Sequence, residues 1–528
     1  MTRRDFLRRS GQLAVSVAVG SRVAARQKVP PALDLSRLRP FVSPLPIPPT
    51  LKATSVKSTG ATHTPVYQLP MRQVETRLHP DLPPTRFWSF GSTFPGPTIE
   101  ARKGQPIWID WINELPSRHF LPIDHTIHGA GHDVPETRAV VHVHGARVKP
   151  EDDGHPESWT TPGHTSSFFY PNQQDATTLW YHDHTMGINR LNVYAGLVGA
   201  YLIRDDEEDA IGLPSGARDI PLIFCDRMLD SSAQLVYPVS DDPEAPWVPG
   251  VFGEAMLVNG ALFPCLDVEP ALYRFRMINA CNGTFLRLSA GEAVPLTQIG
   301  GDQGLLERPA PATLLMLAPA ERADVLVDFS AHAGRAITLV TAGQPVMQYR
   351  VRRTAAGSTP SHVPVLSRRI ARLAESMAVR TRTHALDEVN DAVMQPMRML
   401  INNASWHDPV TERPTLDSVE VWELVNLTDD SHPIHLHLVR FQILDRRIVD
   451  KFEYRTHGRV RYVAPAMPPT PGESGWKDTV RVDSGTVTRI IIKFEGYTGR
   501  YMWHCHLLEH GDNEMMRPLE IVPARAGG

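Results

Sequence analysis

Hydrophobic and polar positions alternate over short segments of the chain, and three of these segments end in the same way. Residues 107–113, 273–279 and 419–426 mix aromatic and β-branched residues, and each closes on an asparagine before a turn-like stretch. This composition is typical of β-strands. The pattern recurs after about 150 residues, which is the size of a domain and far longer than a solenoid repeat. The chain is therefore predicted to contain three related β domains.

Further strand-like segments at 323–329 and 488–494, and 47 prolines in 528 residues, favour short strands and loops over helices. We expect an all-β molecule of sandwiches or barrels. A helical segment is expected near 368–377. The predicted domains and their linker are residues 26–205, 215–353, 354–382 (the linker) and 383–528.

The composition excludes several classes of protein. Hydrophobic residues make up 42% and charged residues 21%, which excludes disorder as the main state. The net charge of −4 lacks the excess of basic residues that is typical of nucleic-acid-binding proteins. No apolar run reaches the roughly 18 residues that a membrane-spanning helix needs. Four cysteines are too few for a disulfide scaffold. We expect small-molecule partners, no nucleic acid, no membrane span, and a monomer.

The first 25 residues have the order of a twin-arginine signal peptide. Arg3 and Arg4 precede a weakly apolar stretch at 13–19, and small residues follow at 23–25. A basic disordered tail is the alternative. The signal predicts a protein that is exported to the periplasm or secreted, in a compartment that permits disulfides without requiring them.

Four His-x-His pairs carry the candidate chemistry. Since residues i and i+2 of a strand face the same side, each pair presents two imidazoles together. The pairs are His142 and His144, His182 and His184, His435 and His437, and His504 and His506. One pair alone is more often structural, but four pairs indicate several borderline-soft metal ions, with copper first by ligand type. Two pairs lie in the first repeat and two in the third, which predicts a metal cluster between those domains with the second domain as a spacer.

Cys505 lies between the histidines of the last pair and therefore points to the opposite face of its strand. With His432, His510 and a weak axial Met515 it completes the ligand types of a blue-copper site. A metal at Cys505 would then be joined to metals at His504 and His506 through one short backbone segment.

The motifs around these residues resemble those of the multicopper oxidases, most closely the bacterial laccase branch with the spore-coat laccase and bilirubin oxidase. The resemblance covers nearly all of the predicted mature chain. It rests on residues 94–99, 180–184, 190–197, 432–437, 475–479 and 503–506. It implies three cupredoxin-like Greek-key domains and four copper ions per chain.

The resemblance also implies a role for each ligand. Type 1 copper would take His432, Cys505, His510 and axial Met515. Type 2 copper would take His142 and His435, and the type 3 pair would take His144, His182, His184, His437, His504 and His506. Asp153 resembles the carboxylate that assists proton delivery to the three-copper cluster in this branch.

The implied activity is that of a laccase. A phenol, an aromatic amine or a tetrapyrrole such as bilirubin would lose electrons one at a time at type 1 copper, and the cluster would reduce O2 to water. The alternatives are a metallo-oxidase of Cu(I) or Mn(II), and a copper-free cell-division protein of the same fold. The absence of a methionine-rich insert disfavours the cuprous oxidase, the complete ligand set disfavours the copper-free protein, and four His-x-His pairs in one chain disfavour a two-domain nitrite reductase.

The chain departs from the branch at two points. Gly511 follows the second type 1 histidine where relatives often have an acidic residue, although Glu509, Asp512 and Glu514 are near. The disulfide of some relatives is not evident. Cys265 and Cys281 are predicted to be free buried thiols, with a disulfide between them as the alternative, and Cys225 is predicted to be a core residue.

Other clusters are interpreted as structural. His125, His128 and His132 form a loop group with solvated or structural roles. Met394, Met397 and Met399 are expected to pack rather than bind a cuprous ion. The rim of the type 1 site is expected to include residues 465–471.

Overall fold

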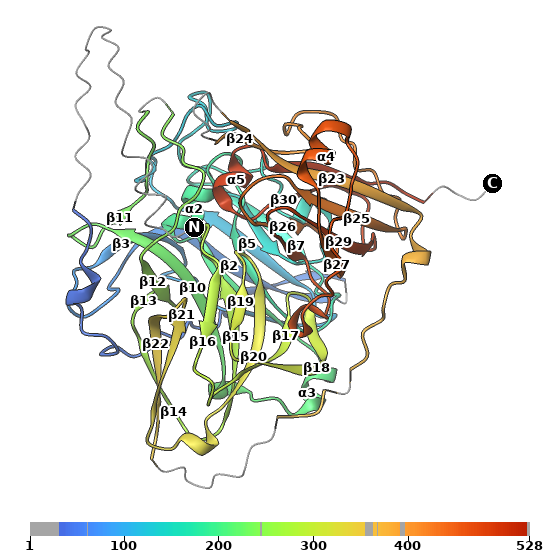
Figure 1. The fold of residues 1–528 in the computed structure, drawn as a ribbon. Coiled ribbons are helices and arrows are strands. Elements are labelled where there is room, and N and C mark those ends of the chain that lie inside the picture. The colour runs from blue at the N-terminus through green and yellow to red at the C-terminus, as the bar shows by residue number, and fades with distance from the viewer. Residues whose placement is uncertain are drawn as a thin grey trace.

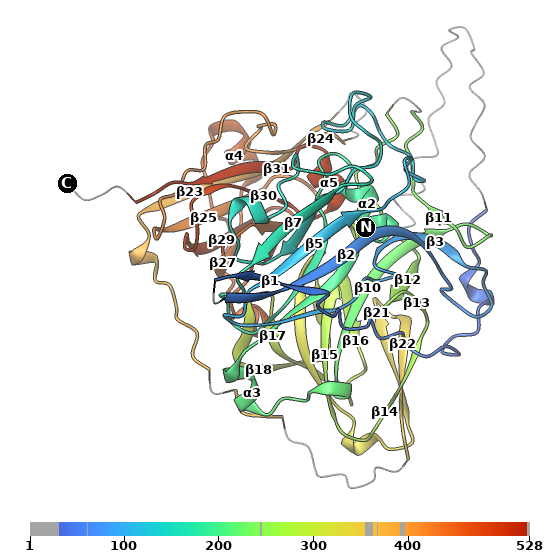
Figure 2. The same ribbon diagram turned by 180° about the vertical axis from the view of Figure 1, so that it is seen from behind.

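The structure, a computed structural model, describes residues 31–60, 62–242, 245–353, 363–366, 368–390 and 396–524. Figure 1 and Figure 2 show three β domains, each made mainly of two sheets, with short helices at their edges. The predicted signal peptide, 1–25, and linker residues 354–362 lie outside the described residues. None of the helices in the described ranges is long and apolar enough to cross a membrane.

The first domain consists of two facing sheets. Its strands are β1 (Ser55–Thr59), β2 (Thr62–Thr76), β3 (Thr85–Phe90), β4 (Ile99–Arg102), β5 (Ile107–Asn113), β6 (Val141–His144), β7 (Thr165–Tyr170), β8 (Thr177–Asp183) and β9 (Val198–Arg204). One sheet has the order β1-β2-β5-β7 with β3 paired to β2, and the other has the order β4-β9-β8-β6.

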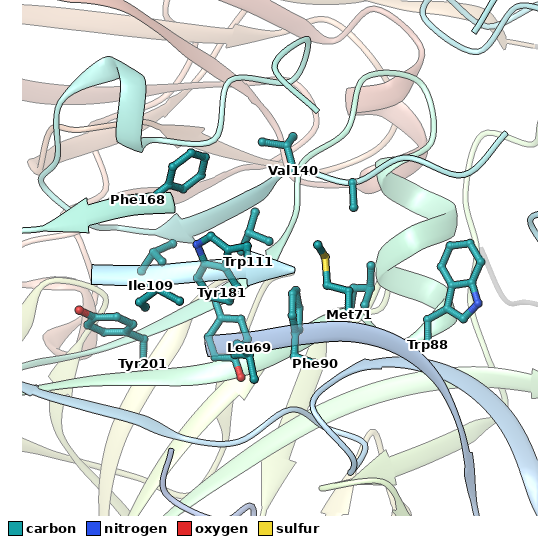
Figure 3. Packing of buried hydrophobic residues seen from close by; sticks show 14 of the residues in the cluster. Leu69, Met71, Trp88, Phe90, Ile109, Trp111, Val140, Phe168, Tyr181 and Tyr201 are labelled. Carbon is teal, nitrogen blue, oxygen red and sulfur yellow. The ribbon is translucent and has the colours of Figure 1, made fainter. Parts of the chain in front are cut away.

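Aromatic side chains fill the space between these two sheets (Figure 3). Phe90 and Trp111 come from one sheet and Tyr181 from the other, with ring centroids 4.9 to 5.6 Å apart. Their polar atoms have partners, since the Trp111 indole donates to the Tyr170 hydroxyl and the Tyr181 hydroxyl to the Pro97 carbonyl. This dense core gives β8, which carries one of the His-x-His pairs, a fixed position.

The second domain repeats the two-sheet arrangement. Its strands are β10 (Asp219–Leu229), β11 (Leu235–Val236), β12 (Ala255–Val258), β13 (Ala261–Leu262), β14 (Cys265–Val268), β15 (Leu272–Asn279), β16 (Leu286–Ser289), β17 (Leu296–Gly301), β18 (Gly304–Ala312), β19 (Leu315–Leu317), β20 (Arg322–Asp328), β21 (Ala336–Thr341) and β22 (Gln344–Val351). The sheet orders are β13-β12-β10-β15-β20-β17-β18, with β11 beside β10, and β14-β22-β21-β16-β19.

The third domain again has two sheets, ordered β24-β23-β25-β29-β27 and β28-β26-β30-β31. These strands are β23 (Arg380–Asn390), β24 (Pro396–Ile401), β25 (Val419–Asn426), β26 (His432–Leu436), β27 (Phe441–Ile448), β28 (Thr479–Val482), β29 (Thr486–Lys493), β30 (Gly499–Cys505) and β31 (Met516–Ile521).

The three repeated segments of the sequence occupy equivalent places in the three domains. Strands β5, β15 and β25 each pair in parallel with an earlier strand and antiparallel with a later one. The closing residues Asn113, Asn279 and Asn426 are fully buried. Each side-chain oxygen accepts a hydrogen bond from the backbone N–H two residues on. The recurring asparagine thus makes an Asx turn that ends the strand.

The α-helices within the described residues are α2 (Asn189–Ala195), α3 (Asp206–Ile211), α4 (Lys451–His457) and α5 (Leu508–Asp512). The prediction of a helix near 368–377 is wrong, because the only helical turn there is a 3-10 turn at Glu375–Met377. Backbone N–H groups that would donate within a helix instead donate to side chains of the neighbouring domains. Ile370 N–H donates to Glu307 of the second domain, and Leu373 N–H donates to Gln442 of the third.

Candidate metal centre

Two strand pairs bring the four His-x-His pairs together. β6 lies antiparallel to β8 with His142 opposite His182, and β26 lies antiparallel to β30 with His435 opposite His504. One strand pair belongs to the first domain and the other to the third, so the histidines meet between these two domains. All eight side chains are at most 2% exposed.

The eight imidazoles form three groups whose nitrogens lie within 4.8 Å of one another. The groups are His142 with His144 and His435, His144 with His182 and His506, and His184 with His437 and His504. Together, the two groups without His142 contain the six histidines of the predicted type 3 set. The structure therefore gathers all eight predicted histidines at one place.

The hydrogen bonds of these rings leave nitrogen lone pairs directed into the cluster. The Nδ1 atoms of His142, His182 and His435 lie 2.7, 2.6 and 2.9 Å from backbone carbonyl oxygens. Since a carbonyl can only accept, each Nδ1 is the protonated donor, which leaves a lone pair on Nε2. These three Nε2 atoms have no partner among the described residues. Imidazoles anchored in this way are typical of metal ligands.

The third group brings ring nitrogens even closer. His504 Nε2 lies 3.2 Å from His184 Nε2 and 3.3 Å from His437 Nε2. Because His504 Nδ1 donates to the Cys505 carbonyl, its Nε2 presents a lone pair to the other two rings. Lone pairs that converge in a dry interior need a cation between them, so this donor set fits a bound metal.

Burial also favours the neutral, metal-binding form of these rings. Burial lowers the pKa of His504 to about 4, and it holds the pKa of six further rings well below the usual range. The six are His144, His182, His184, His435, His437 and His506. Metal ions would therefore not compete with protons for these nitrogens at neutral pH.

Asp153 lies at the edge of the cluster and is 1% exposed. Its Oδ2 accepts a 2.7 Å hydrogen bond from His437 Nδ1, and its backbone carbonyl accepts one from His142 Nδ1. Burial raises the pKa of this carboxyl group above its usual value. Asp153 therefore joins two of the ligand groups and can hold a proton beside them.

Asp478 also contacts the cluster, although the sequence analysis gave it no role. Its Oδ1 lies 3.1 Å from His144 Nε2 and its carbonyl accepts from His435 Nδ1. Arg322 of the second domain holds the carboxylate through two hydrogen bonds of 2.7 and 2.5 Å. The interpretation of the second domain as a spacer is thus incomplete, since it contributes the arginine that fixes this anchor. Residues 475–479 formed a recognisable motif, but nothing in the sequence linked it to Arg322.

The sulfur site lies on the other face of β30. Cys505 Sγ lies 3.6 Å from His432 Nδ1 and 3.9 Å from His510 Nδ1, and the two Nδ1 atoms are 3.2 Å apart. Met515 is fully buried, its N–H donates to the His510 carbonyl, and its carbonyl accepts from the Cys505 N–H. The four residues of the predicted type 1 set are therefore neighbours, back to back with the imidazole cluster.

The acidic residues near Gly511 are engaged elsewhere. Asp512 accepts two hydrogen bonds from Arg190 on α2, and Glu509 accepts from the Tyr237 hydroxyl and from Asn282. Glu514 accepts from the backbone of Trp406. A Cβ atom at Gly511 would lie 3.9 Å from His504 Nδ1. The carboxylates that bond cluster histidines are therefore those of Asp153 and Asp478.

Several secondary predictions can be compared with the structure. Cys225, Cys265 and Cys281 are free and buried, as predicted. Met399 packs in the core of the third domain, whereas Met397 is 58% exposed and Met394 lies outside the described residues.

The predicted rim of the type 1 site, residues 465–471, stays a prediction. Contacts on the sulfur site come from another segment as well. The His510 imidazole bonds the backbone of Pro249, and the Trp247 indole donates to the Glu509 carbonyl. The segment before β12 thus lies over the sulfur site.

Comparison with known proteins agrees with this geometry. Two family models, both described as "Multicopper oxidase", match the chain, one at residues 133–208 and the other at residues 377–525. A laccase of Bacillus subtilis (strain 168) is 43% identical over 512 residues, covering 92% of this chain and 99% of the relative. A laccase of Haloferax volcanii is 36% identical, covering 98% of this chain and 91% of the relative.

Solved structures share the fold. The crystal structure of a laccase from Pediococcus acidilactici Pa5930 superposes with a TM-score of 0.75 at 26% identity, covering 93% of this chain and 97% of that one. McoA multicopper oxidase from Aquifex aeolicus gives 0.73 at 26% identity, covering 91% and 99%. The predicted all-β fold of three cupredoxin-like domains is confirmed.

These matches and the buried His and Cys donor set define a copper-dependent oxidoreductase. The chain belongs to the multicopper oxidase family. Among its similar relatives are the bacterial and archaeal laccases, which confirms the resemblance noted in the sequence.

Proposed function

We propose that this chain is a laccase-like oxidase. It would couple the one-electron oxidation of phenols, aromatic amines or tetrapyrroles such as bilirubin to the four-electron reduction of O2 to water. The observation that carries the proposal is the complete donor set, with ten histidines, one cysteine and one methionine gathered on the two faces of β30. The laccase relatives support the same activity.

The donor set suits four copper ions. One type 1 ion would be held by His432, Cys505, His510 and Met515, and one type 2 ion by His142 and His435. Two type 3 ions would be held by His144, His182, His184, His437, His504 and His506. Bound copper supplies the one-electron redox chemistry, and the thiolate, thioether and imidazole ligands suit both Cu(I) and Cu(II).

The protein's own residues prepare the site for this chemistry. Carbonyls, Asp153 and Asp478 fix the ring orientations, so that the imidazoles need little rearrangement to bind metal. The backbone from His504 to His506 gives a short covalent route between the two faces. Asp153 would deliver protons, because its carboxyl group contacts His437 and its burial favours the protonated form.

A substrate panel tests this function. Copper-loaded protein is assayed for O2 uptake with a phenol, an aromatic amine, bilirubin, Mn(II) and Cu(I), and peroxide is measured in parallel. We expect uptake with the organic reductants and no peroxide release. Activity on the metal ions alone would select the metallo-oxidase, and a protein that fails to take up copper would select the copper-free alternative.

We also propose that the chain is exported by the twin-arginine route, on the basis of Arg3, Arg4 and the segments that follow them. Replacing both arginines with lysine should retain the protein in the cytoplasm. Secretion of this double variant at the level of the unchanged chain would refute the proposal.

A further inference from the structure

A second group of metal-binding side chains lies outside the buried centre. His128, Glu157 and His407 place one ligand atom each within 4.8 Å of one another. They come from three separate loops, which follow β5, β6 and β24. His128 is half-buried and the other two are exposed, so an ion could reach them from solvent.

The rings and carboxylates of this group are positioned by neighbouring residues. The two imidazoles have centroids 4.5 Å apart at an angle of 62°. The indole of Trp406, which is 1% exposed, donates a 3.2 Å hydrogen bond to Glu157 Oε1. The N–H of Trp406 donates to Glu514 Oε2, and the other oxygen of Glu514 lies 3.8 Å from His128 Nδ1. One buried tryptophan therefore holds two carboxylates beside the imidazoles, as outer partners hold ligands at metal sites.

The other histidines of the same loop behave differently. The rings of His125 and His132 stack with centroids 3.9 Å apart, and His125 Nδ1 donates to the Ala130 carbonyl. Both side chains thus have structural contacts within the loop, as the sequence suggested for all three. Only His128 is directed to residues of another domain, and its partner His407 lies 279 positions further along the chain.

We propose that His128, Glu157 and His407 form a surface site for one divalent first-row transition metal ion, in addition to the buried copper ions. Two imidazoles and a carboxylate suit Zn2+, Ni2+ or Cu2+, whereas Ca2+ and Mg2+ prefer oxygen ligands. In a tetrahedral site with bonds of about 2.1 Å the ligand atoms lie about 3.4 Å apart. Because two of the three side chains are exposed, small rotations about their side-chain bonds can close the present gap.

An ion at this place would link the first and third domains. His128 and Glu157 belong to loops of the first domain, and His407 belongs to a loop of the third. Because the ion would bind this seam only when the domains are docked, its binding should raise the thermal stability of the whole molecule.

Zinc binding to copper-loaded protein that has been dialysed against a chelator, to remove copper from the surface site, tests the proposal, since Zn2+ is redox-inert and the buried centre stays filled. Equilibrium dialysis with elemental analysis should find one saturable zinc ion per chain, and zinc should raise the melting temperature. His128→Ala and His407→Ala should each weaken zinc binding at least about tenfold and remove the stabilisation. His132→Ala, a change in the same loop, should leave both measurements unchanged.

This test does not depend on the oxidase activity. It compares the number of zinc ions bound per chain by the unchanged protein and by its variants. No saturable zinc ion in the copper-loaded protein would overturn it. Equal zinc binding by the double variant His128→Ala/His407→Ala and the unchanged chain would overturn it as well.

Discussion

At the scale of single residues, the hydrogen bond that each imidazole already makes determines which of its nitrogens can bind a metal ion. His142, His182 and His435 give one nitrogen to a carbonyl oxygen and leave the other free. Hydrogen bonds to the backbone and to two buried carboxylates thereby select the tautomer that can bind metal. The sequence identified the histidines themselves, since their spacing is local. It could not assign the partners of their second nitrogens, which depend on tertiary contacts.

Asp153 provides the prediction at this scale. In Asp153→Asn the side chain keeps its size but can no longer hold and release a proton. We expect O2 turnover to fall by about 100-fold or more, as is typical for the loss of a general acid. The visible absorbance of the sulfur site should be retained, because Asp153 does not contact Cys505, His432 or His510.

The matched control for this change is Asp152→Asn. Asp152 accepts from the Phe169 N–H and not from a cluster histidine, so its loss should leave turnover within a few-fold of normal. Stopped-flow reoxidation and steady-state O2 uptake would check both variants. Unchanged turnover in Asp153→Asn would refute the proposed proton-delivery role.

At the scale of elements, strands were predictable and irregular segments were not. The segments 107–113 and 419–426 match β5 and β25, and 273–279 differs from β15 by one residue. Their aromatic and β-branched composition and their closing asparagine are local signals. The segment 368–377 was mispredicted because Glu307 and Gln442, which bond its backbone, are distant in the chain. Propensity alone cannot anticipate such partners.

The buried asparagines that end the repeated strands allow a test at this scale. Asn279 accepts from the Cys281 N–H, and its amide donates to the carbonyls of Thr284 and Leu317. Asn279→Ala leaves these buried groups without partners and should lower the free energy of unfolding by about 2–4 kcal/mol. The exposed Gln344→Ala in the same domain should change it by less than about 0.5 kcal/mol. Urea unfolding would measure both values, and equal stability of the two variants would contradict the structural role of the Asx turn.

At the scale of the whole molecule, three domains are needed to make one centre. The first and third supply the ligands, and the second supplies Arg322, which forms a bidentate ion pair with Asp478. The sequence predicted the seam between the outer domains from the distribution of the His-x-His pairs. It gave no indication of this contribution from the second domain, or of the proximity of His128 to His407, because both depend on how the domains dock.

Arg322→Met tests this coupling between domains. It leaves the Asp478 carboxylate buried without its cation, which typically costs about 3–5 kcal/mol. Since Asp478 anchors His144 and His435, the variant should also retain less copper after dialysis. Arg352→Met breaks the exposed pair with Glu269 and should cost less than about 1 kcal/mol with no loss of copper. Full stability and copper content in Arg322→Met would show that the second domain is only a spacer.

Strand β30 carries a sulfur site on one face and an imidazole cluster on the other. The most direct measurement combines copper analysis with the visible spectrum of the copper-loaded chain and of Cys505→Ser. After dialysis against a chelator to remove surface-bound copper, four copper ions and a band at about 600 nm are expected for the chain. Three ions and no such band are expected for the variant. A fully loaded chain without the band, or a variant that keeps it, would contradict the account.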